Sequence, residues 1–103
     1  MGNPMKIRAT LNGDTTDIKI LMRHDMETGL RKDTAGALVP AWYIQTVVVS
    51  VAGKTVINAS WGQAVSKDPY LALKVKGANK GDPVSVTWTD NKNDTRTDEI
   101  TIA

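Results

Sequence analysis

Apolar and polar residues alternate with a period of two along most of this 103-residue chain. Ile7, Ala9 and Leu11, for example, alternate with Arg8 and Thr10. Successive side chains of a β-strand point to opposite faces of the sheet, so this alternation predicts strands that bury one face. The segments that show it are residues 5–11, 18–23, 42–51, 55–60, 71–76, 84–89 and a last one with Ile100 and Ile102.

Turn signals separate these seven segments at short intervals, as at Asn12-Gly13-Asp14 and Ala52-Gly53-Lys54. The run Val47-Val48-Val49 predicts a strand that is buried on both faces. No window has an apolar stripe at helical spacing, and the only helical piece we expect is a single turn over 63–67. Such short strands with frequent turns are typical of two packed antiparallel sheets. We therefore expect one all-β domain over residues 1–103, an immunoglobulin-like antiparallel β-sandwich of about seven strands.

One connection is unusually long, because eighteen residues, 24–41, separate two of the predicted strands. Structureless connections longer than about 12–15 residues are uncommon in compact domains unless they have a function. Asp33-Thr34-Ala35-Gly36 within it is a turn signal, and Pro40 restricts the path back into the sheet. We therefore expect a protruding loop or hairpin, which is where recognition residues usually lie on a rigid sandwich.

Composition excludes several classes of protein. The chain has no cysteine, which rules out disulfides, thiol nucleophiles and cysteine-ligated metal centres. The net charge is only +2, and the basic residues are scattered along the sequence, so we expect no binding to nucleic acid. No segment approaches the ~18 apolar residues that span a membrane. The first residues lack the features of a secretory signal peptide.

The sequence also offers little chemistry for an enzyme. His24 is the only histidine, and no serine lies in a nucleophile-elbow pattern that it would serve. One imidazole and two nearby carboxylates, from His24, Asp25 and Glu27, are weak evidence for a metal site. We interpret these residues as a polar junction between strand and loop. The run of residues 90–94 fails the calcium-loop pattern and predicts a hairpin loop. We expect no catalytic residue, no metal and no cofactor.

Aromatic residues are the remaining candidates for recognition. Trp88 ends an alternating segment, which favours a place in the core. Trp42 and Tyr43 are adjacent, so one should face inward and the other outward, at the base of the long connection. Trp61 and Tyr70 bracket a crossing between sheets, and Tyr70 is equally compatible with a core cap and with an interface.

Several stretches together resemble the SoxZ family, in order and at matching spacing from Ile7 onward. They are 24–33 (HDMETGLRKD), Gly36, 39–41 (VPA), 61–71 (WGQAVSKDPYL), 76–82 (KGANKGD), 86–91 (VTWTDN) and 97–102 (TDEITI). Asp25 departs from the pattern, because many members have proline after the histidine. The resemblance implies a β-sandwich that is the non-catalytic half of the SoxYZ carrier complex. Its partner, SoxY, holds a reactive cysteine on a flexible arm, where sulfur intermediates of thiosulfate oxidation are carried between the enzymes of the pathway.

The resemblance also implies a periplasmic location, reached by export together with a signal-bearing partner. We expect a heterodimer with a SoxY-like subunit, formed through an apolar sheet face and its flanking loops, and transient docking of Sox enzymes. The isolated chain should form a homodimer or a looser aggregate. The residues that we expect at the partner interface, on the surface, are His24, Met26, Arg31, Lys32, Pro40, Trp42, Tyr43, Trp61 and Tyr70.

Alternatives remain open from the residues alone. Arg31 and Lys32 are either neighbours of an anionic thiosulfonate cargo or a solvated positive pair. The chain is alternatively a stand-alone immunoglobulin-like binding or adhesion module. A sulfur or redox enzyme of the superoxide-reductase type needs an iron site with several histidines and a cysteine, and this composition argues against it.

Overall fold

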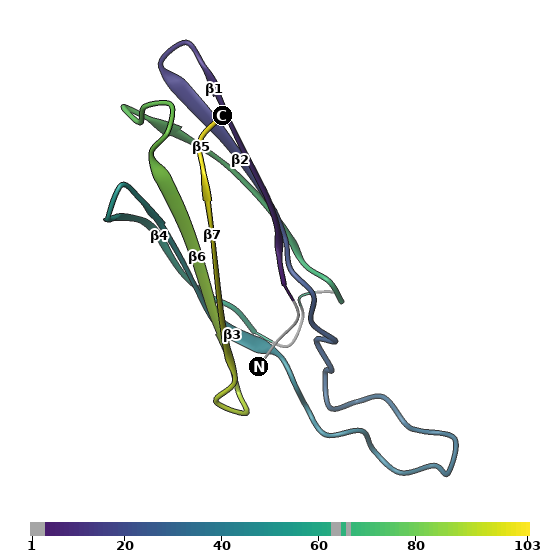
Figure 1. The fold of residues 1–103 in the computed structure, drawn as a ribbon. Helices are drawn as coiled ribbons and strands as arrows, with labels where there is room; N and C mark the ends of the chain where they lie inside the picture. The colour runs from purple at the N-terminus through teal and green to yellow at the C-terminus, as the bar shows by residue number, and fades with distance from the viewer. Residues whose placement is uncertain (1–3, 63–64, 66) are drawn as a thin grey trace.

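The computed structural model describes residues 4–62, 65 and 67–103, and its seven strands form two antiparallel sheets (Figure 1). The strands are β1 (Lys6–Asn12), β2 (Thr15–Leu21), β3 (Ile44–Val51), β4 (Lys54–Ser60), β5 (Tyr70–Lys76), β6 (Pro83–Asp90) and β7 (Thr95–Thr101). One sheet has the order β1-β2-β5 and the other β4-β3-β6-β7. The predicted all-β antiparallel sandwich is confirmed. The helical turn predicted over 63–67 includes residues 63, 64 and 66, which lie outside the described residues.

A tight turn between β3 and β4 places β4 in the same sheet as β3. Only Ala52 and Gly53 separate these strands, and both have positive φ angles, of 52° and 79°. A two-residue turn with both central residues at positive φ matches the twist of an antiparallel pair. This turn therefore keeps β4 beside β3, rather than letting it cross to the sheet of β1, β2 and β5.

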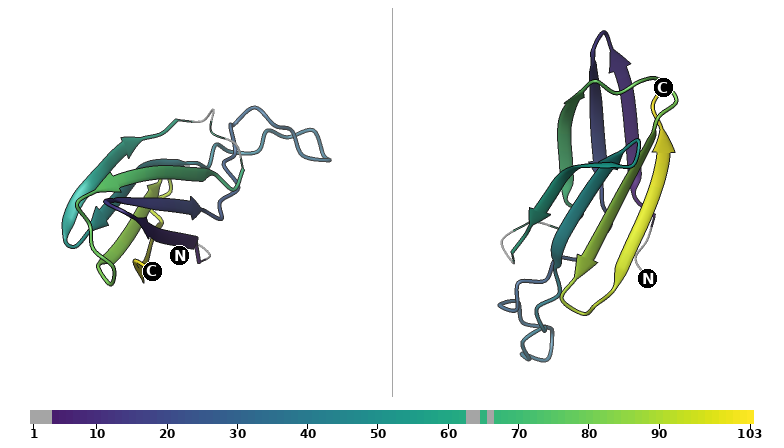
Figure 2. Two further views of the ribbon diagram at one scale, coloured as in Figure 1. Left: turned by 90° about the horizontal axis from the view of Figure 1, so that it is seen from above. Right: turned by 90° about the vertical axis from the view of Figure 1, so that its left-hand side faces the viewer.

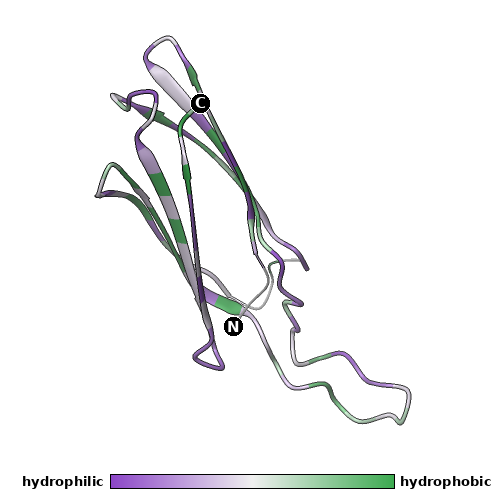
Figure 3. Ribbon diagram, viewed as in Figure 1, coloured by the Kyte–Doolittle hydropathy of each residue, from purple (hydrophilic) through white to green (hydrophobic). Residues whose placement is uncertain are grey.

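The core forms from the inward-facing half of each strand. Val84, Val86 and Trp88 on β6 are buried against Ile18 and Ile20 from β2. Figure 3 shows this alternation along β6 as green and pale bands. Trp88 lies in the core, as its position in the alternation predicts.

The predicted burial of β3 on both faces is wrong. Val47 and Val49 are buried, but Val48 is only half-buried, on the outer face, because no further layer covers this sheet among the described residues.

The outer faces of six strands are mostly polar. The outer face of β1, β2 and β5 is rich in lysine and arginine, and that of β3, β6 and β7 is rich in serine and threonine. Alternation places nearly all of the apolar side chains in the core and leaves polar ones outside.

The connection between β2 and β3 projects beyond the end of both sheets (Figures 1 and 2). It gives the molecule an elongated shape of 53 × 21 × 20 Å. None of the described residues forms a helix of the length and apolarity that crossing a membrane requires.

Two buried polar atoms, Thr16 Oγ1 and Trp88 Nε1, have no hydrogen-bond partner among the described residues, and the first yields a prediction. The Thr16 hydroxyl is fully buried on β2 and has no hydrogen-bond partner among the described residues. An unpaired buried hydroxyl costs about 1–3 kcal/mol, and valine has the same shape without it. Thr16→Val should raise the free energy of unfolding by about 1 kcal/mol in urea denaturation. Thr16→Ser, which keeps the hydroxyl and loses a methyl group, should lower it, and a loss in the valine variant would contradict this account.

Candidate functional site

The projecting connection is a narrow hairpin held by its own backbone hydrogen bonds. At its base Glu27 and Trp42 exchange two bonds, with N···O distances of 2.6 and 2.9 Å. Further out, the Val39 N–H donates to the Arg31 carbonyl at 2.7 Å. The segment 24–41 is therefore an ordered hairpin, as its internal turn signal predicts.

The turn at the end of the hairpin is the one expected at Asp33-Thr34-Ala35-Gly36. The Gly36 N–H donates to the Asp33 carbonyl at 3.0 Å. The Asp33 carboxylate also accepts N–H bonds from Ala35 and Ala37, at 2.9 and 3.0 Å. An aspartate side chain that bonds its own following backbone fixes the turn without help from the sandwich.

The hairpin presents apolar side chains to solvent. Leu30 is 82% exposed and Leu38 is 61% exposed, and with Tyr70 they are the large hydrophobic residues that the described chain exposes most. Single exposed apolar residues are ordinary, but two of these three lie on one projecting element. Both belong to the outer part of the hairpin, since Leu38 pairs with Lys32 just before the turn.

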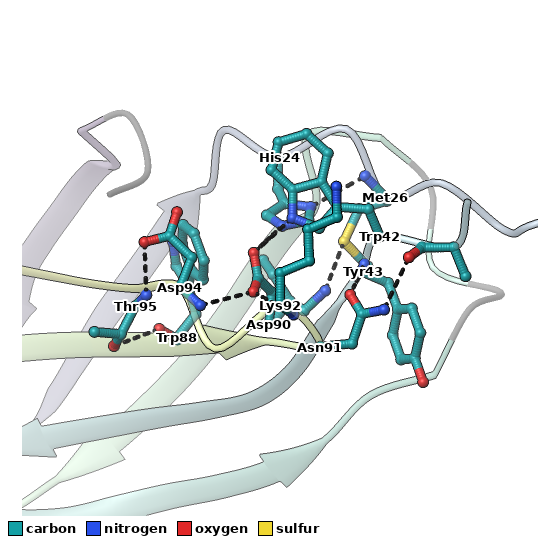
Figure 4. A network of polar contacts seen from close by, with 12 residues as sticks. His24, Met26, Trp42, Tyr43, Trp88, Asp90, Asn91, Lys92, Asp94 and Thr95 are labelled. Carbon is teal, nitrogen blue, oxygen red and sulfur yellow. Dashed lines mark hydrogen bonds and ion pairs between the residues drawn. The ribbon is translucent and has the colours of Figure 1, made fainter. Parts of the chain in front are cut away.

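The base of the hairpin is anchored by the buried carboxylate of Asp90 at the end of β6 (Figure 4). Its Oδ2 accepts hydrogen bonds from His24 Nε2 at 3.0 Å and from Trp42 Nε1 at 2.7 Å. Its Oδ1 accepts two backbone N–H bonds, from Lys92 and Asp94, both at 2.9 Å. His24 precedes the outgoing leg of the hairpin and Trp42 ends the returning leg, so one carboxylate holds both legs.

The second nitrogen of His24 is also occupied. The Met26 N–H donates to Nδ1 at 3.1 Å, so Nδ1 has no proton and the ring donates from Nε2 to Asp90. Met26 has a φ angle of 51°, a left-handed conformation that costs an L-residue about 1–2 kcal/mol. It is held there by this bond and by the Ile44 N–H, which donates to its sulfur at 3.3 Å.

Aromatic packing closes the anchor. The His24 ring lies 4.8 Å from the Trp42 ring and 5.1 Å from Trp88, measured between centroids. The Lys92 ammonium lies 4.4 Å above the Trp42 ring, a cation–π contact. His24 is therefore enclosed by two tryptophans and the carboxylate, with 6% of its surface exposed.

The residue after Asp90 clamps the returning leg. The Asn91 side chain accepts the Tyr43 N–H at 2.9 Å and donates to the Ala41 carbonyl at 2.8 Å. The Asn91 N–H donates to the Tyr43 carbonyl at 3.0 Å. Three bonds thus tie the β6–β7 turn to residues 41–43, where the hairpin re-enters the sandwich.

The crossing between β4 and β5 meets the same base. The Asp68 carboxylate accepts the His24 N–H at 3.1 Å, and the Asp68 N–H donates to the His24 carbonyl at 2.9 Å. Asp68 has a φ angle of 50°, which aspartate tolerates better than most residues. The β4–β5 connection therefore binds the backbone of His24, and Asp90 at the end of β6 binds its ring.

Burial raises the pKa of the Asp90 carboxyl, but hydrogen bonds from His24, Trp42, Asp94 and Lys92 together outweigh it. The net result is a pKa below the ordinary value, so the carboxylate is charged at neutral pH. A histidine beside a carboxylate also occurs in catalytic triads, but there the other ring nitrogen faces a nucleophile. Here that nitrogen accepts a backbone N–H, and the arrangement is suited to anchoring rather than to proton transfer.

No group of three His, Cys, Asp or Glu side chains in the described ranges is placed to hold a metal ion.

The structure separates the predicted interface residues into three groups. Arg31, Lys32, Pro40 and Tyr70 are exposed, and Trp42, Tyr43 and Trp61 are half-buried. The predicted surface position of His24 and Met26 is wrong, because the anchor buries both. Tyr70 is 59% exposed and does not cap the core. Trp42 turns toward Asp90, whereas the Tyr43 side chain points away from it (Figure 4).

The two exposed basic residues, Arg31 and Lys32, differ in their contacts. Arg31 donates from Nε to both carboxylate oxygens of Glu27, at 3.0 and 2.9 Å. The hydrogen bond to Glu27 and its negative charge raise the pKa of Arg31 above its ordinary value. Lys32 is exposed further along the hairpin.

Sequence reasoning missed Asp90, Asn91, Leu30 and Leu38. Asp90 follows Val84, Val86 and Trp88 in the inward-facing alternation of β6. The alternation therefore predicts that its side chain points into the core. An inward carboxylate requires hydrogen-bond donors, and this signal was available from the sequence.

The family model described as "Sulphur oxidation protein SoxZ" matches residues 5–101, nearly the whole chain. The chain belongs to the SoxZ family. Membership implies a role in sulfur oxidation together with SoxY, in a periplasmic system, as a non-catalytic subunit of the carrier complex. No curated protein matches the chain.

Two solved structures resemble the SoxZ-family chain in fold. A hypothetical protein of Pyrococcus horikoshii matches with a TM-score of 0.68 and 11% identity, over 99% of this chain and 89% of that one. Superoxide reductase (neelaredoxin) from Ignicoccus hospitalis matches with a TM-score of 0.59 and 12% identity, over 99% of this chain and 82% of that one. Identities this low show a shared sandwich fold alone, and this chain has one histidine and no cysteine.

The anchor makes a prediction about Asp90→Asn. An amide places an NH₂ group against at least one of the donors, because His24, Trp42 and two backbone N–H groups all donate here. The variant should lose about 2–4 kcal/mol in urea denaturation, and trypsin should cut after Arg31 or Lys32 faster than in the unmodified chain. Asp25→Asn, at an exposed neighbour, should change stability by less than about 0.5 kcal/mol.

The same contacts set a pH dependence. Because the folded-state pKa of Asp90 is lowered, its stabilising contribution is complete above the unfolded-state pKa and declines as the pH falls below about 4. Asp98, whose pKa is also lowered, chiefly by the Arg96 hydrogen bond, should supply the acid dependence that remains in Asp90→Asn. Equal acid sensitivity in the two proteins would contradict the assigned role of Asp90.

Proposed function

We propose that the chain is the non-catalytic half of a SoxYZ carrier and binds a cysteine-bearing SoxY-like subunit through the hairpin of residues 24–41. The observation that supports this most strongly is the combination of an exposed apolar end, Leu30 and Leu38, with a buried polar anchor at the base. A preorganised element loses little conformational freedom when it binds, which favours affinity. In this role the chain helps to present the sulfur-bearing arm of SoxY to the pathway enzymes.

The absence of cysteine suits a carrier subunit. Sulfur intermediates bound to a thiol transfer readily to a second thiol by exchange. A subunit without cysteine leaves the SoxY thiol as the site that holds the cargo. Lys32 is better placed than Arg31 to meet an anionic cargo, because Glu27 already occupies the Arg31 guanidinium.

The proposal includes the cellular location, the docking of pathway enzymes and the self-association that we expect from the sequence. The chain acts in the periplasm after export with its signal-bearing partner, and Sox enzymes dock transiently on the complex. Without SoxY, the exposed leucines favour a homodimer or looser self-association. A chain that stays monomeric and has no affinity for SoxY would instead fit a stand-alone binding or adhesion module.

The hairpin proposal predicts the effect of Leu30→Ser/Leu38→Ser. Each buried leucine contributes about 1.5–3 kcal/mol when it leaves water, so the double variant should bind purified SoxY at least about tenfold more weakly in isothermal titration calorimetry. Its melting temperature should match that of the unmodified chain, because both side chains are exposed.

Lys54→Ser provides the control for that experiment. It shortens an exposed side chain of β4, outside the hairpin and outside the residues predicted at the interface, and should leave the affinity for SoxY unchanged. Unchanged SoxY affinity in the double-leucine variant would refute the hairpin as the interface.

A further inference from the structure

The outer face of the β1-β2-β5 sheet gathers basic side chains that lie far apart in the sequence. Outward positions on these strands hold five cations and a single anion, Asp17, on a chain whose net charge is only +2. Asp17 is engaged by Asn12, at 3.2 Å, and by Lys74, at 3.9 Å. The five cations are Lys6, Arg8, Lys19, Lys74 and Lys76, and we call this surface the basic face.

The register of the sheet makes this clustering costly. Arg8 on β1 stands directly opposite Lys19 on β2. Like charges facing each other across neighbouring strands are destabilising. On the described parts of β3, β6 and β7, by contrast, Glu99 is the only charged residue on the outer face. No ion pair among the described residues involves Arg8 or Lys19, and an anionic partner would offset their repulsion.

A groove of about 550 Å³ opens beside these cations. Its walls include Lys6, Arg8 and Lys19, together with the apolar surfaces of Leu21 and Tyr70. Lys6, Leu21 and Tyr70 stand in one row across the three strands, so charge and apolar surface meet at the same end of the face. The groove also reaches Ile7, whose side chain faces inward, and so passes over the outer edge of β1, which Ala103 covers further along, at Ala9 and Leu11.

We propose that the basic face binds an acidic polypeptide segment that places one bulky apolar side chain in this groove. Carboxylates of the segment would pair with Lys6, Arg8 and Lys19, and Leu21 and Tyr70 would cover the apolar anchor. Charge complementarity of this kind confers specificity and fast association. Tyr70 is the only aromatic residue on the face, whereas binding of single-stranded nucleic acid usually requires several stacking aromatics.

This site is separate from the hairpin contact and does not rest on the proposed function. The isolated chain should bind such a segment without SoxY, and loss of SoxY binding in the hairpin variant should leave this binding intact. The two proposals therefore fail independently.

The test is a titration of the nitrogen-15-labelled full chain with the synthetic peptide Asp-Glu-Asp-Phe-Glu-Asp-Glu, followed by NMR. We expect amide shifts at Lys6, Lys19, Leu21 and Tyr70, and affinity that falls steeply as salt is added. A peptide with serine in place of phenylalanine should bind more weakly, as should one with asparagine and glutamine in place of the acids.

Arg8→Glu is the decisive variant, because it places an acid opposite Lys19 and should fold at least as stably as the unmodified chain. It should lower affinity for the peptide by about tenfold or more, whereas Lys54→Glu, the same charge change on an exposed residue of β4, should lower it less than about threefold. No binding at millimolar peptide, or equal loss in both variants, would overturn the proposal. Tighter binding of an oligothymidylate at the same amides would overturn it in favour of a nucleic-acid surface.

Discussion

The buried carboxylate of Asp90 is the group on which the arrangement of the hairpin depends. Removing a charge from water is costly unless donors replace its hydration. Two side chains and two backbone N–H groups do so here. Since the two side-chain donors, His24 and Trp42, lie at the two ends of the hairpin, satisfying this charge also fixes where the chain leaves and re-enters the sandwich.

The anchor divides the molecule into a supporting sandwich and a projecting hairpin, which we propose as the recognition element. Beyond Glu27 and Trp42, the hairpin is held by its own ladder and by the Asp33 turn. Gly29 allows the legs to approach closely, since a Cβ there would lie 3.2 Å from the Ala41 Cβ, and its φ angle is 85°. An element stabilised in this way keeps its shape while it exposes leucines, which suits a subunit that works by contact rather than by chemistry.

Much of the fold follows from alternation, because each strand turns one face toward the core and most of the turns between strands are short. Ile7, Ala9 and Leu11 are a clear example. The burial of His24 was not predictable in the same way, because it depends on Asp90, sixty-six positions away along the chain. The basic face was not predictable for a similar reason. Only the strand register shows that Arg8, Lys19 and Lys74 lie on one face. Contacts that depend on register or on distant partners leave no local signal in a sequence.

The measurement that tests the central claim most directly is amide hydrogen exchange of the chain alone and in complex with SoxY. The hairpin account predicts that SoxY slows exchange along residues 27–41, most strongly around Leu30 and Leu38. It also predicts little change on the outer face of β3, β6 and β7. Slowed exchange confined to a sheet face, with an unaffected hairpin, would contradict it.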